Sequence, residues 1–351
     1  MRRISLSIIL FLSVVAFVLI AASWQNIVAA SPLFFGYRST DLFGIYTARL
    51  DGMQFRAVLV DAKREMSHAR VSPDCKHITF TRYNRILKDG IAEEAGSGYL
   101  HTEVVVANID GSNQRSIEAV GPLILNANSS WIDNDTIIYV HRSDLTSLPE
   151  LRIYRLSSNS NSRLPTPLEL AVSDPHCVAN KVIFPVIPIS ENSGVCQLWT
   201  MDLDGKEIRQ LTKAKIKPTS SRFDFKLGDY DLWLSPDATT AVFMRYFGGM
   251  DWRIYTARLI DGSELPLTKP GVPSGIPKWA SDGKLIIYVC WDRSALEKLG
   301  LYTITPAAAQ NRKIPLPPGF LYTHPSFFPN TGSSNDAKII FSARRVPGLP
   351  K

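Results

Sequence analysis

The sequence predicts an all-β protein: a six-bladed β-propeller with a composite closing blade, preceded by an N-terminal hydrophobic helix. A tight polar turn followed by an apolar strand, as in Ser72-Pro73-Asp74 and the residues after it, recurs six times. A strand that ends in Asp-Gly or another polar turn also recurs six times. Residues 31–351 contain little helical periodicity. Radially repeated units of about 40–50 residues with four strands each are typical of propellers, whose blades pack face to face.

Residues 1–30 form a separate segment, predicted to be a signal peptide or a signal-anchor helix. Arg2-Arg3 supplies a positive start, and Ile4 to Ser23 is almost wholly apolar. About 20 apolar residues can span a bilayer, whereas the apolar core of a cleaved signal runs about 7–15. Ala29-Ala30 offers a cleavage site before Ser31, so cleavage and anchoring through residues 4–23 both stay open. Either way we expect residues 31–351 to be exported, into the periplasm or outside the cell.

Charge and cysteine content exclude some classes. The formal net charge is +7, without a run of five or six like charges, so we expect no nucleic-acid partner. No Cys-x-x-Cys pair occurs, so zinc has no support from spacing. We expect mostly free, buried thiols, with disulfides in three pairings as the alternative, for the cysteines Cys75, Cys177, Cys196 and Cys290.

The first repeat predicts the two inner strands of each blade. Pro and Asp supply the backbone angles that a tight turn requires. The strand after each turn is expected to end on an aromatic residue: Phe80, Tyr139, Phe184, Phe243, Tyr288 and Phe341.

The second repeat predicts the two outer strands. Sequences such as Ile-Tyr-Thr-Ala precede the turns at Asp51-Gly52, Asp110-Gly111, Ser157-Ser158, Asp204-Gly205, Asp261-Gly262 and Pro306-Ala307. An outer strand follows each turn, for example Glu207 to Leu211.

The two ends of the chain are expected to share the closing blade. The C-terminus supplies an inner strand and Lys338 to Arg344, and residues near 45–60 supply the outer strands. Pairing the ends removes an open sheet edge. Leu33 to Arg38 also resembles a second strand, which leaves one such strand redundant. Insertions lie at Arg85–Leu100, Lys215–Tyr230 and Asn330–Ala337, and each is either a binding loop or a tolerated surface insertion.

These repeats resemble those of the TolB-like propeller family. The resemblance rests on Trp279 to Tyr288, Leu198 to Gly205 and Val71 to Phe80, and it covers nearly all of residues 33–345. It implies an extracytoplasmic six-bladed propeller, often an interaction module near a bacterial envelope. TolB itself carries a small α/β domain before its propeller, and no such sequence precedes the repeats here. Related propellers occur in prolyl-oligopeptidase-type enzymes, whose Gly-x-Ser-x-Gly motif is absent, and in oligogalacturonate lyases, which use metal and histidine.

One column of the aligned repeats contains candidate ligand-binding residues at the mouth of the central channel. Six residues before each turn Asp, or its equivalent, stand His68, Asn128, Asp174, Asp231, Ile276 and His324. The five polar members could hold a polar ligand or a divalent metal. Alternatively they satisfy backbone groups between blades. His176-Cys177 is a weaker pair, because adjacent strand residues point to opposite faces.

The sequence thus favours an exported, non-catalytic scaffold that binds an envelope or extracellular protein as a monomer. No catalytic residue and no cofactor is predicted, although a channel metal stays open. One alternative is a lyase or hydrolase acting on carbohydrate or peptide through His68, His324, Asp174 and Asp231. Another is a sensor whose loops 85–100 and 215–230 contact the partner.

Overall fold

The computed structural model describes residues 42–346, apart from residues 84–86, 89–90, 93–101, 119–120, 122–123, 145, 168, 190–193, 217–225, 293–294 and 309. The predicted export segment 1–30 and the predicted strand Leu33–Arg38 lie outside these residues. The described part contains no helix with the length and apolar character needed to cross a membrane.

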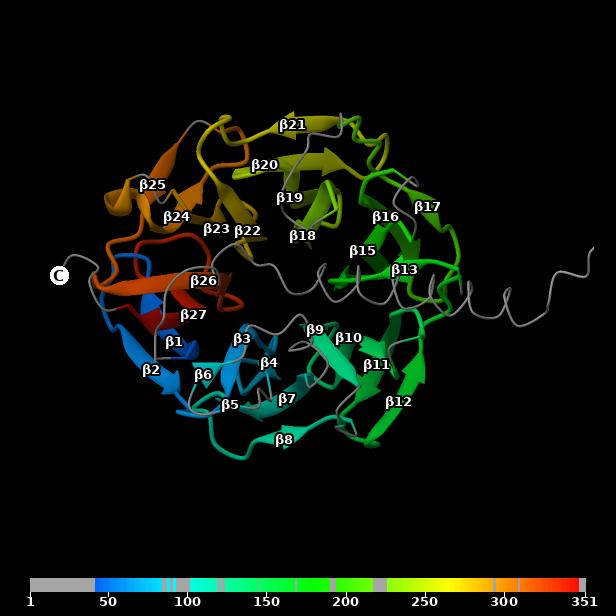
Figure 1. The fold of residues 1–351 in the computed structure, drawn as a ribbon, viewed down its shortest axis with the longest axis horizontal. Helices are drawn as coiled ribbons and strands as arrows, with labels where there is room; N and C mark the ends of the chain where they lie inside the picture. Colours follow the sequence, from blue (N-terminus) through cyan, green and yellow to red (C-terminus); the bar gives the residue numbers. More distant parts are fainter. Residues whose placement is uncertain are drawn as a thin grey trace, which may run out of the picture.

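The described residues form an all-β ring, as predicted (Figure 1). Neighbouring inner strands contact one another in cyclic order around a central axis. They are β3 (Glu65–Val71), β9 (Leu125–Trp131), β13 (Ala171–Val172) with β14 (His176–Val178), β18 (Gly228–Leu234), β22 (Ser274–Trp279) and β26 (Phe320–Phe327).

Each inner strand begins a four-stranded antiparallel unit. The second strands are β4 (His77–Tyr83), β10 (Thr136–Arg142), β15 (Lys181–Ile187), β19 (Thr240–Gly248), β23 (Ile286–Cys290) and β27 (Lys338–Arg345). The third strands are β7 (Thr102–Asn108), β11 (Glu150–Arg155), β16 (Gln197–Asp202), β20 (Asp251–Arg258), β24 (Gly300–Ile304) and β1 (Gly44–Arg49). The outer strands are β8 (Arg115–Ser116), β12 (Ser160–Arg163), β17 (Arg209–Gln210), β21 (Glu264–Pro266), β25 (Asn311–Lys313) and β2 (Arg56–Leu59).

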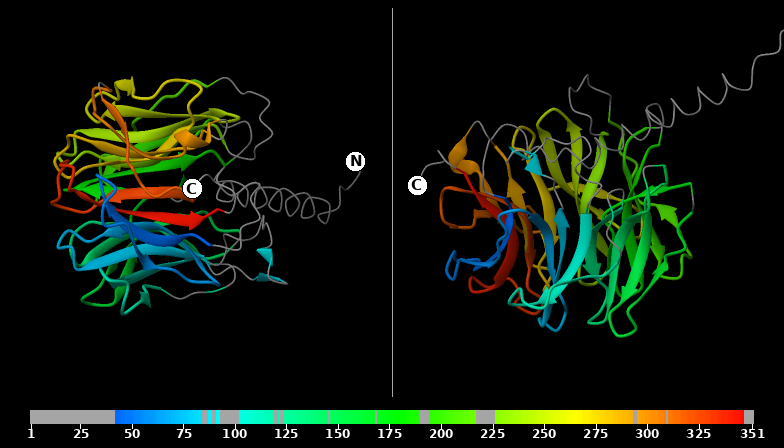
Figure 2. Two further views of the ribbon diagram at one scale, coloured as in Figure 1. Left: turned by 90° about the vertical axis from the view of Figure 1, so that its left-hand side faces the viewer. Right: turned by 60° about the horizontal axis from the view of Figure 1, so that its bottom comes forward.

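Two of these units are linked by a single parallel residue pair. Thr102 on β7 pairs in parallel with Leu125 on β9, so the units β3-β4-β7-β8 and β9-β10-β11-β12 form one eight-stranded sheet. The side views show the sheets standing around the axis (Figure 2). Outside the units, β5 (Leu87–Lys88) and β6 (Ile91–Ala92) form a small hairpin within the predicted insertion at 85–100, and η1 (Leu296–Lys298) is a single 3-10 turn.

The closing unit is composite, as the repeat pattern predicted. β1, near the start of the described chain, pairs with β27 near its end, with Ile45 opposite Ser342. β2 then pairs with β1 as the outermost strand. Both ends of the sequence therefore contribute to one sheet, and the pairing covers what would otherwise be exposed edges of β1 and β27.

The polar turns have the geometry that their residue types predict. The Ser72 hydroxyl donates to the Asp74 carboxylate at 2.7 Å, and the next residue, Cys75, adopts φ 59°. Ser235 and Asp237 repeat this contact at 2.5 Å. At the outer turn Gly111 has φ 87°, a conformation that glycine adopts without steric cost.

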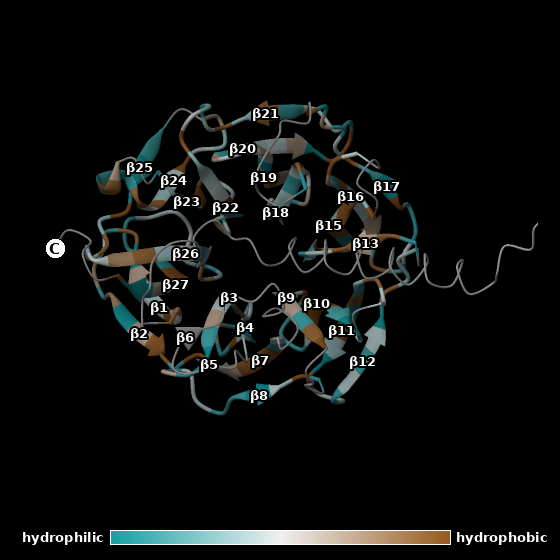
Figure 3. Cartoon of the chain, in the orientation of Figure 1, coloured by the Kyte–Doolittle hydropathy of each residue, from teal (hydrophilic) through white to brown (hydrophobic). Residues whose placement is uncertain are grey.

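The core lies between the sheets. All six predicted aromatic residues of the second strands are at most 2% exposed. The strands run beyond these residues, however, so their predicted ends were wrong. β4, for example, continues from Phe80 to Tyr83. Hydrogen bonding to both neighbouring strands continues past the aromatic residue, and sequence alternation does not mark where it stops. The outer strands β8 and β12 are hydrophilic (Figure 3).

The cysteines form no disulfide among the described residues. Cys177, Cys196 and Cys290 are buried and Cys75 is half-buried. This agrees with the expectation of mostly free, buried thiols.

Candidate functional site

The predicted column occupies an irregularity that recurs in every inner strand. All six members have left-handed backbones, with φ between 36° and 55°. In five strands the pairing register shifts at this point, as between Ser67 and Arg70 or between Tyr230 and Trp233. In the remaining unit the inner strand is interrupted between Val172 and His176. Left-handed backbone costs roughly 1–2 kcal/mol for a non-glycine residue, so the surrounding ring must hold each one in place.

Neighbouring members of the column meet. The rings of His68 and His324 lie 3.8 Å apart between centroids. The side-chain amide of Asn128 donates to the Asp174 carboxylate. Asp174 in turn interacts electrostatically with Asp231. Ile276, the apolar member, is buried.

The two histidines are held from their own strands. The Nδ1 atom of His68 lies 2.6 Å from the Ser67 hydroxyl, and that of His324 lies 3.1 Å from the Thr323 hydroxyl. Among the described residues, no three His, Cys, Asp or Glu side chains gather as a metal-binding group would. The column therefore consists of contacting pairs rather than one shared coordination sphere.

A second ring of side chains lies two residues further along each inner strand. Its members are Arg70, Ser130, His176, Trp233, Lys278 and Ser326. Three of them converge on the Trp233 ring. The Arg70 guanidinium carbon lies 5.1 Å from its centroid, the Lys278 ammonium lies 4.7 Å away, and the His176 ring stacks on it at 3.5 Å. Such contacts combine cation–π attraction with aromatic packing.

The backbone fixes which nitrogen of His176 carries its proton. The Leu234 N–H donates to His176 Nδ1 at 3.0 Å, so Nδ1 acts as an acceptor. In a neutral imidazole the other nitrogen, Nε2, is then the donor. Burial, followed by the charges of Lys278 and Arg70, lowers the pKa of His176 well below its usual value and keeps the ring neutral.

A cavity of about 220 Å³ lies at the end of the channel where the Ser-Pro-Asp turns are. Second-ring residues Arg70, Ser130, His176, Trp233 and Ser326 line it. Its wall also contains apolar residues from the strand ends and turns: Val71, Pro73, Trp131, Leu234, Pro236, Trp279, Phe327, Phe328 and Pro329. The column residues do not line this cavity. The second ring, rather than the column, therefore lines the cavity.

Opposite charges share the channel interior. Burial lowers the pKa of Lys278 to about 7, and the Arg70 charge acts in the same direction. Burial and Asp231 raise the pKa of Asp174 to about 7, and burial also raises that of Asp231. Burial lowers the pKa of Arg70 to about 10. Desolvation thus disfavours the charged form of each of these groups, and the attraction between the acidic and basic groups offsets only part of this effect.

The second ring was missed because only one alignment column was taken as the site. The same alignment, displaced by two positions, already contains Arg70, His176 and Lys278. In the sequence, the adjacency of Cys177 makes His176 a weak candidate, and Arg70 lies two residues before the repeated turn at Ser72. The detectable signal is the occurrence of Arg70, His176, Trp233 and Lys278 at one position of the aligned inner strands.

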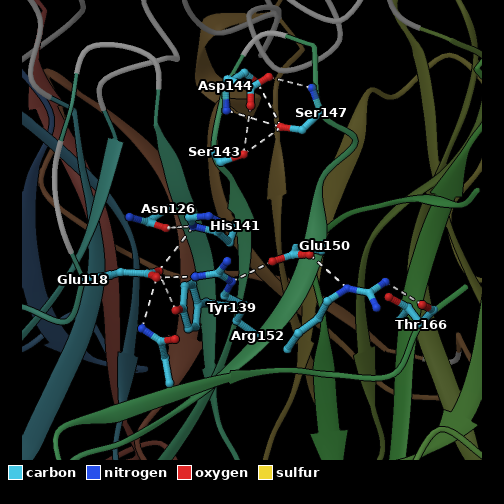
Figure 4. A network of polar contacts seen from close by, with 12 residues as sticks. Glu118, Asn126, Tyr139, His141, Ser143, Asp144, Ser147, Glu150, Arg152 and Thr166 are labelled. Carbon is cyan, nitrogen blue, oxygen red and sulfur yellow. Dashed lines mark hydrogen bonds and ion pairs between the residues drawn. The ribbon is translucent and has the colours of Figure 1, made fainter. Parts of the chain in front are cut away.

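A second polar network joins Glu118 to side chains of β10 and β11 (Figure 4). The Glu118 carboxylate accepts from the Tyr139 hydroxyl at 2.6 Å and forms an ion pair with Arg152, and it lies 3.3 Å from Nδ1 of His141. Its members are mutually satisfied. We interpret it as support for the unit that contains β10 and β11.

The radial four-stranded sheets, together with polar inner strands, define the protein as a β-propeller. Its structure is similar to that of TolB from Acinetobacter baumannii, with a TM-score of 0.54 and 12% identity, covering 89% of this chain and 66% of that one. A propeller in the nidogen/laminin complex matches with a TM-score of 0.52 and 10% identity, covering 78% and 94%. Hydrazine synthase from Kuenenia stuttgartiensis matches with a TM-score of 0.54 and 10% identity, covering 79% and 45%.

These similarities show the fold, and the chain spans just under two thirds of the length of the matched TolB. No model of a protein family matches the sequence. No curated protein matches it either.

Proposed function

We propose that this protein is an exported, non-catalytic binding propeller that takes part of an envelope or extracellular partner into the mouth of its channel. One observation carries the proposal: the cavity at the turn end is lined by exposed turn residues such as Pro73 and Ser281 and by polar second-ring side chains, among them the buried, charged Arg70. A rigid ring with a polar, concave centre is a typical binding surface. One of the matched structures is itself a protein complex, that of nidogen and laminin.

Export is part of this proposal and rests on the sequence of residues 1–30. The positive start and the apolar stretch Ile4 to Ser23 support it. Cell fractionation of the full chain is expected to recover it outside the cytoplasm. N-terminal sequencing of the recovered protein then distinguishes cleavage before Ser31 from an intact anchor.

Photo-crosslinking in cells tests the binding mode. A photoreactive p-benzoylphenylalanine replaces Ser281, an exposed residue at the cavity wall, in the full chain. The matched control carries it at Ile260, which is 85% exposed in the β20–β21 turn. The proposal expects a discrete adduct from position 281 and none from position 260. Adducts from 260 alone would place the binding surface on the outside of the ring and contradict the proposal.

Enzymatic activity on carbohydrate or peptide is a second candidate, favoured by one observation. The pKa of Asp174 is raised to about 7 by burial and by Asp231, so it could serve as a general acid near neutral pH. Asp174→Asn and Asp231→Asn variants, assayed against polysaccharide and peptide libraries, test this role. Turnover that both variants abolish, while Asp204→Asn preserves it, would favour the enzyme over the scaffold.

A further inference from the structure

Arg70 and Lys278 are buried basic side chains that form no ion pair with another described residue. They are 5% and 3% exposed, and neither lies within 4.0 Å of a carboxylate oxygen in the described part of the chain. Buried arginines and lysines are nearly always paired, since desolvation of a lone charge costs several kcal/mol. Arg245 shows the usual arrangement, because its guanidinium is bound by Asp229 and Glu264 at 2.6 Å each.

The hydrogen-bonding capacity around these side chains is also unfilled. Arg70 donates through Nη1 to the Ala69 carbonyl at 2.8 Å, and its Nε has no partner among the described residues. Lys278 donates to the Leu232 carbonyl at 3.3 Å, a long contact for an ammonium group. The Ser130 hydroxyl is buried and, within the described residues, also lacks a partner. All three side chains therefore have hydrogen-bonding capacity that no described residue uses.

His176 adds an oriented donor to the same place. Since the Leu234 N–H occupies Nδ1, the neutral ring offers Nε2–H as its remaining donor. Arg70, Ser130 and His176 all line the cavity, and the Lys278 ammonium lies 4.7 Å from the Trp233 ring that lines it too. The cavity lining therefore contains donors from three side chains and the positive charge of Arg70, with the Lys278 amine beside the Trp233 ring.

The shape of the cavity limits what can reach these side chains. A volume of about 220 Å³ corresponds to roughly seven water molecules at about 30 Å³ each. The wall toward the turns is mostly apolar, with Trp131, Trp279 and Phe327 among its residues. These features suit a ligand with a compact anionic tip on a short apolar stem.

The carboxyl groups of the column limit how much negative charge a ligand can bring into the cavity. Asp174 and Asp231 act electrostatically on both Arg70 and Lys278 and would repel additional negative charge. A single negative charge is therefore better accommodated than a dianion such as phosphate. The planar fork of arginine matches a carboxylate, which accepts two hydrogen bonds at once.

We propose that the channel cavity binds a monoanionic carboxylate on a short apolar stem, with its oxygens bound by Arg70, Ser130 and His176. The inference rests on the proposed binding function and names the chemistry that the channel recognises. The carboxylate can belong to a free small acid or to a protein partner, as a chain terminus or an acidic side chain. The apolar wall then surrounds the stem.

Calorimetry and tryptophan fluorescence with the full chain test the proposal. Hexanoate and hexanamide share a stem and differ in charge, so hexanoate is expected to bind about tenfold more tightly or better. Equal affinity for the two probes, binding of neither probe or peptide, or tighter binding of inorganic phosphate would overturn the assignment. A peptide ending in Ala-Leu-Leu with a free carboxylate, compared with its C-terminal amide and with an internal Asp peptide, distinguishes a protein source from a free acid.

Variants locate the binding and separate the two proposals. Arg70→Gln is expected to weaken hexanoate binding about tenfold or more, and Ser130→Ala about two- to fivefold. The control Arg253→Gln, which removes a surface-side ion pair with Asp251, should bind as the parent does. If Arg70→Gln does not fold, Ser130→Ala and the parent's preference for hexanoate over hexanamide decide the outcome. A crosslink from Ser281 together with no preference for the carboxylate would refute the anion and leave the binding function standing.

Discussion

Arg70 on β3 reaches Trp233 on β18, the inner strand on the opposite side of the ring, with its guanidinium carbon 5.1 Å from the ring centroid (Figure 1). β9 and β14 separate the two strands on one side, and β22 and β26 separate them on the other. A single side chain therefore bridges the axis. The channel is thereby divided into a cavity on the turn side and the column of His68, Asp174 and their counterparts on the other.

Trp233 is expected to contribute to stability as well as to binding. It stacks on His176 at 3.5 Å and faces two cations, so Trp233→Ala loses packing and leaves both cations more poorly compensated. We expect a loss of about 2 kcal/mol or more in the free energy of unfolding, measured by urea denaturation. Trp233→Phe, the control, should lose less than half of that. Equal losses would mean that the size and face of the aromatic ring do not matter.

The left-handed backbone of the column predicts which substitutions it tolerates. His68 has φ 55°, a conformation that asparagine adopts readily and β-branched residues avoid. His68→Val should therefore be less stable than His68→Asn by about 1–2 kcal/mol. Thermal unfolding of the pair measures the difference. Because both variants remove the imidazole, equal stability would show that this backbone is not strained.

Asp174 predicts a pH-dependent term in stability. Its pKa rises from 3.8 in the unfolded chain to about 7 in the fold, so the folded state binds the proton more tightly. The resulting stabilisation is complete below pH 3.8 and is lost as the pH rises through about 7. In Asp174→Asn the amide stays neutral, so its melting temperature relative to the parent should rise by about 2 °C or more between pH 5 and pH 8.

A control separates this effect from general charge removal. Asp204 is exposed, and its pKa is lowered by Lys206. Asp204→Asn should therefore change little, and in the opposite direction. A constant difference between Asp174→Asn and the parent at both pH values would contradict a raised pKa for Asp174.

The composite unit predicts that stability depends on residues near the start of the described chain. Ile45 on β1 is fully buried and lies opposite Ser342 on β27. Ile45→Ala should lower the free energy of unfolding by about 2–4 kcal/mol. Met53, 64% exposed in the turn after β1, provides the control, since Met53→Ala should cost less than about 0.5 kcal/mol. Equal effects would mean that β1 does not close the ring.

The sequence predicted the architecture because the repeats encode it locally. Each Ser-Pro-Asp or Asp-Gly turn fixes its own hairpin, and the aromatic residues such as Phe80 and Phe243 mark buried second strands. The composite closing unit could also be predicted by counting the repeats. The first Ile-Tyr-Thr-Ala copy requires a neighbouring strand on its inner side, and the C-terminal repeat supplies that strand. Strand ends did not follow, because pairing on both sides continues where the pattern of single residues gives no signal.

The site was only half predictable for a geometric reason. Alignment of the six turns identified the column at His68 and its counterparts, but not the register shift that occurs there. The contact between Arg70 and Trp233 depends on which strands lie opposite each other in the ring. These two residues are 163 positions apart in the sequence. No local pattern contains that information, so the convergence on Trp233 appears only once the ring is closed.

The pairing of β1 with β27 also affects the order of events during synthesis. Ile45 leaves the ribosome about 300 residues before Ser342, the residue opposite it, exists. The earlier units can form hairpins as they emerge, since their contacts are local, but β1 has no partner on its β27 edge until the last strand arrives. The ring can therefore close only after β27 has been synthesised, and a ribosome stalled before residue 338 holds a chain whose ring is still open.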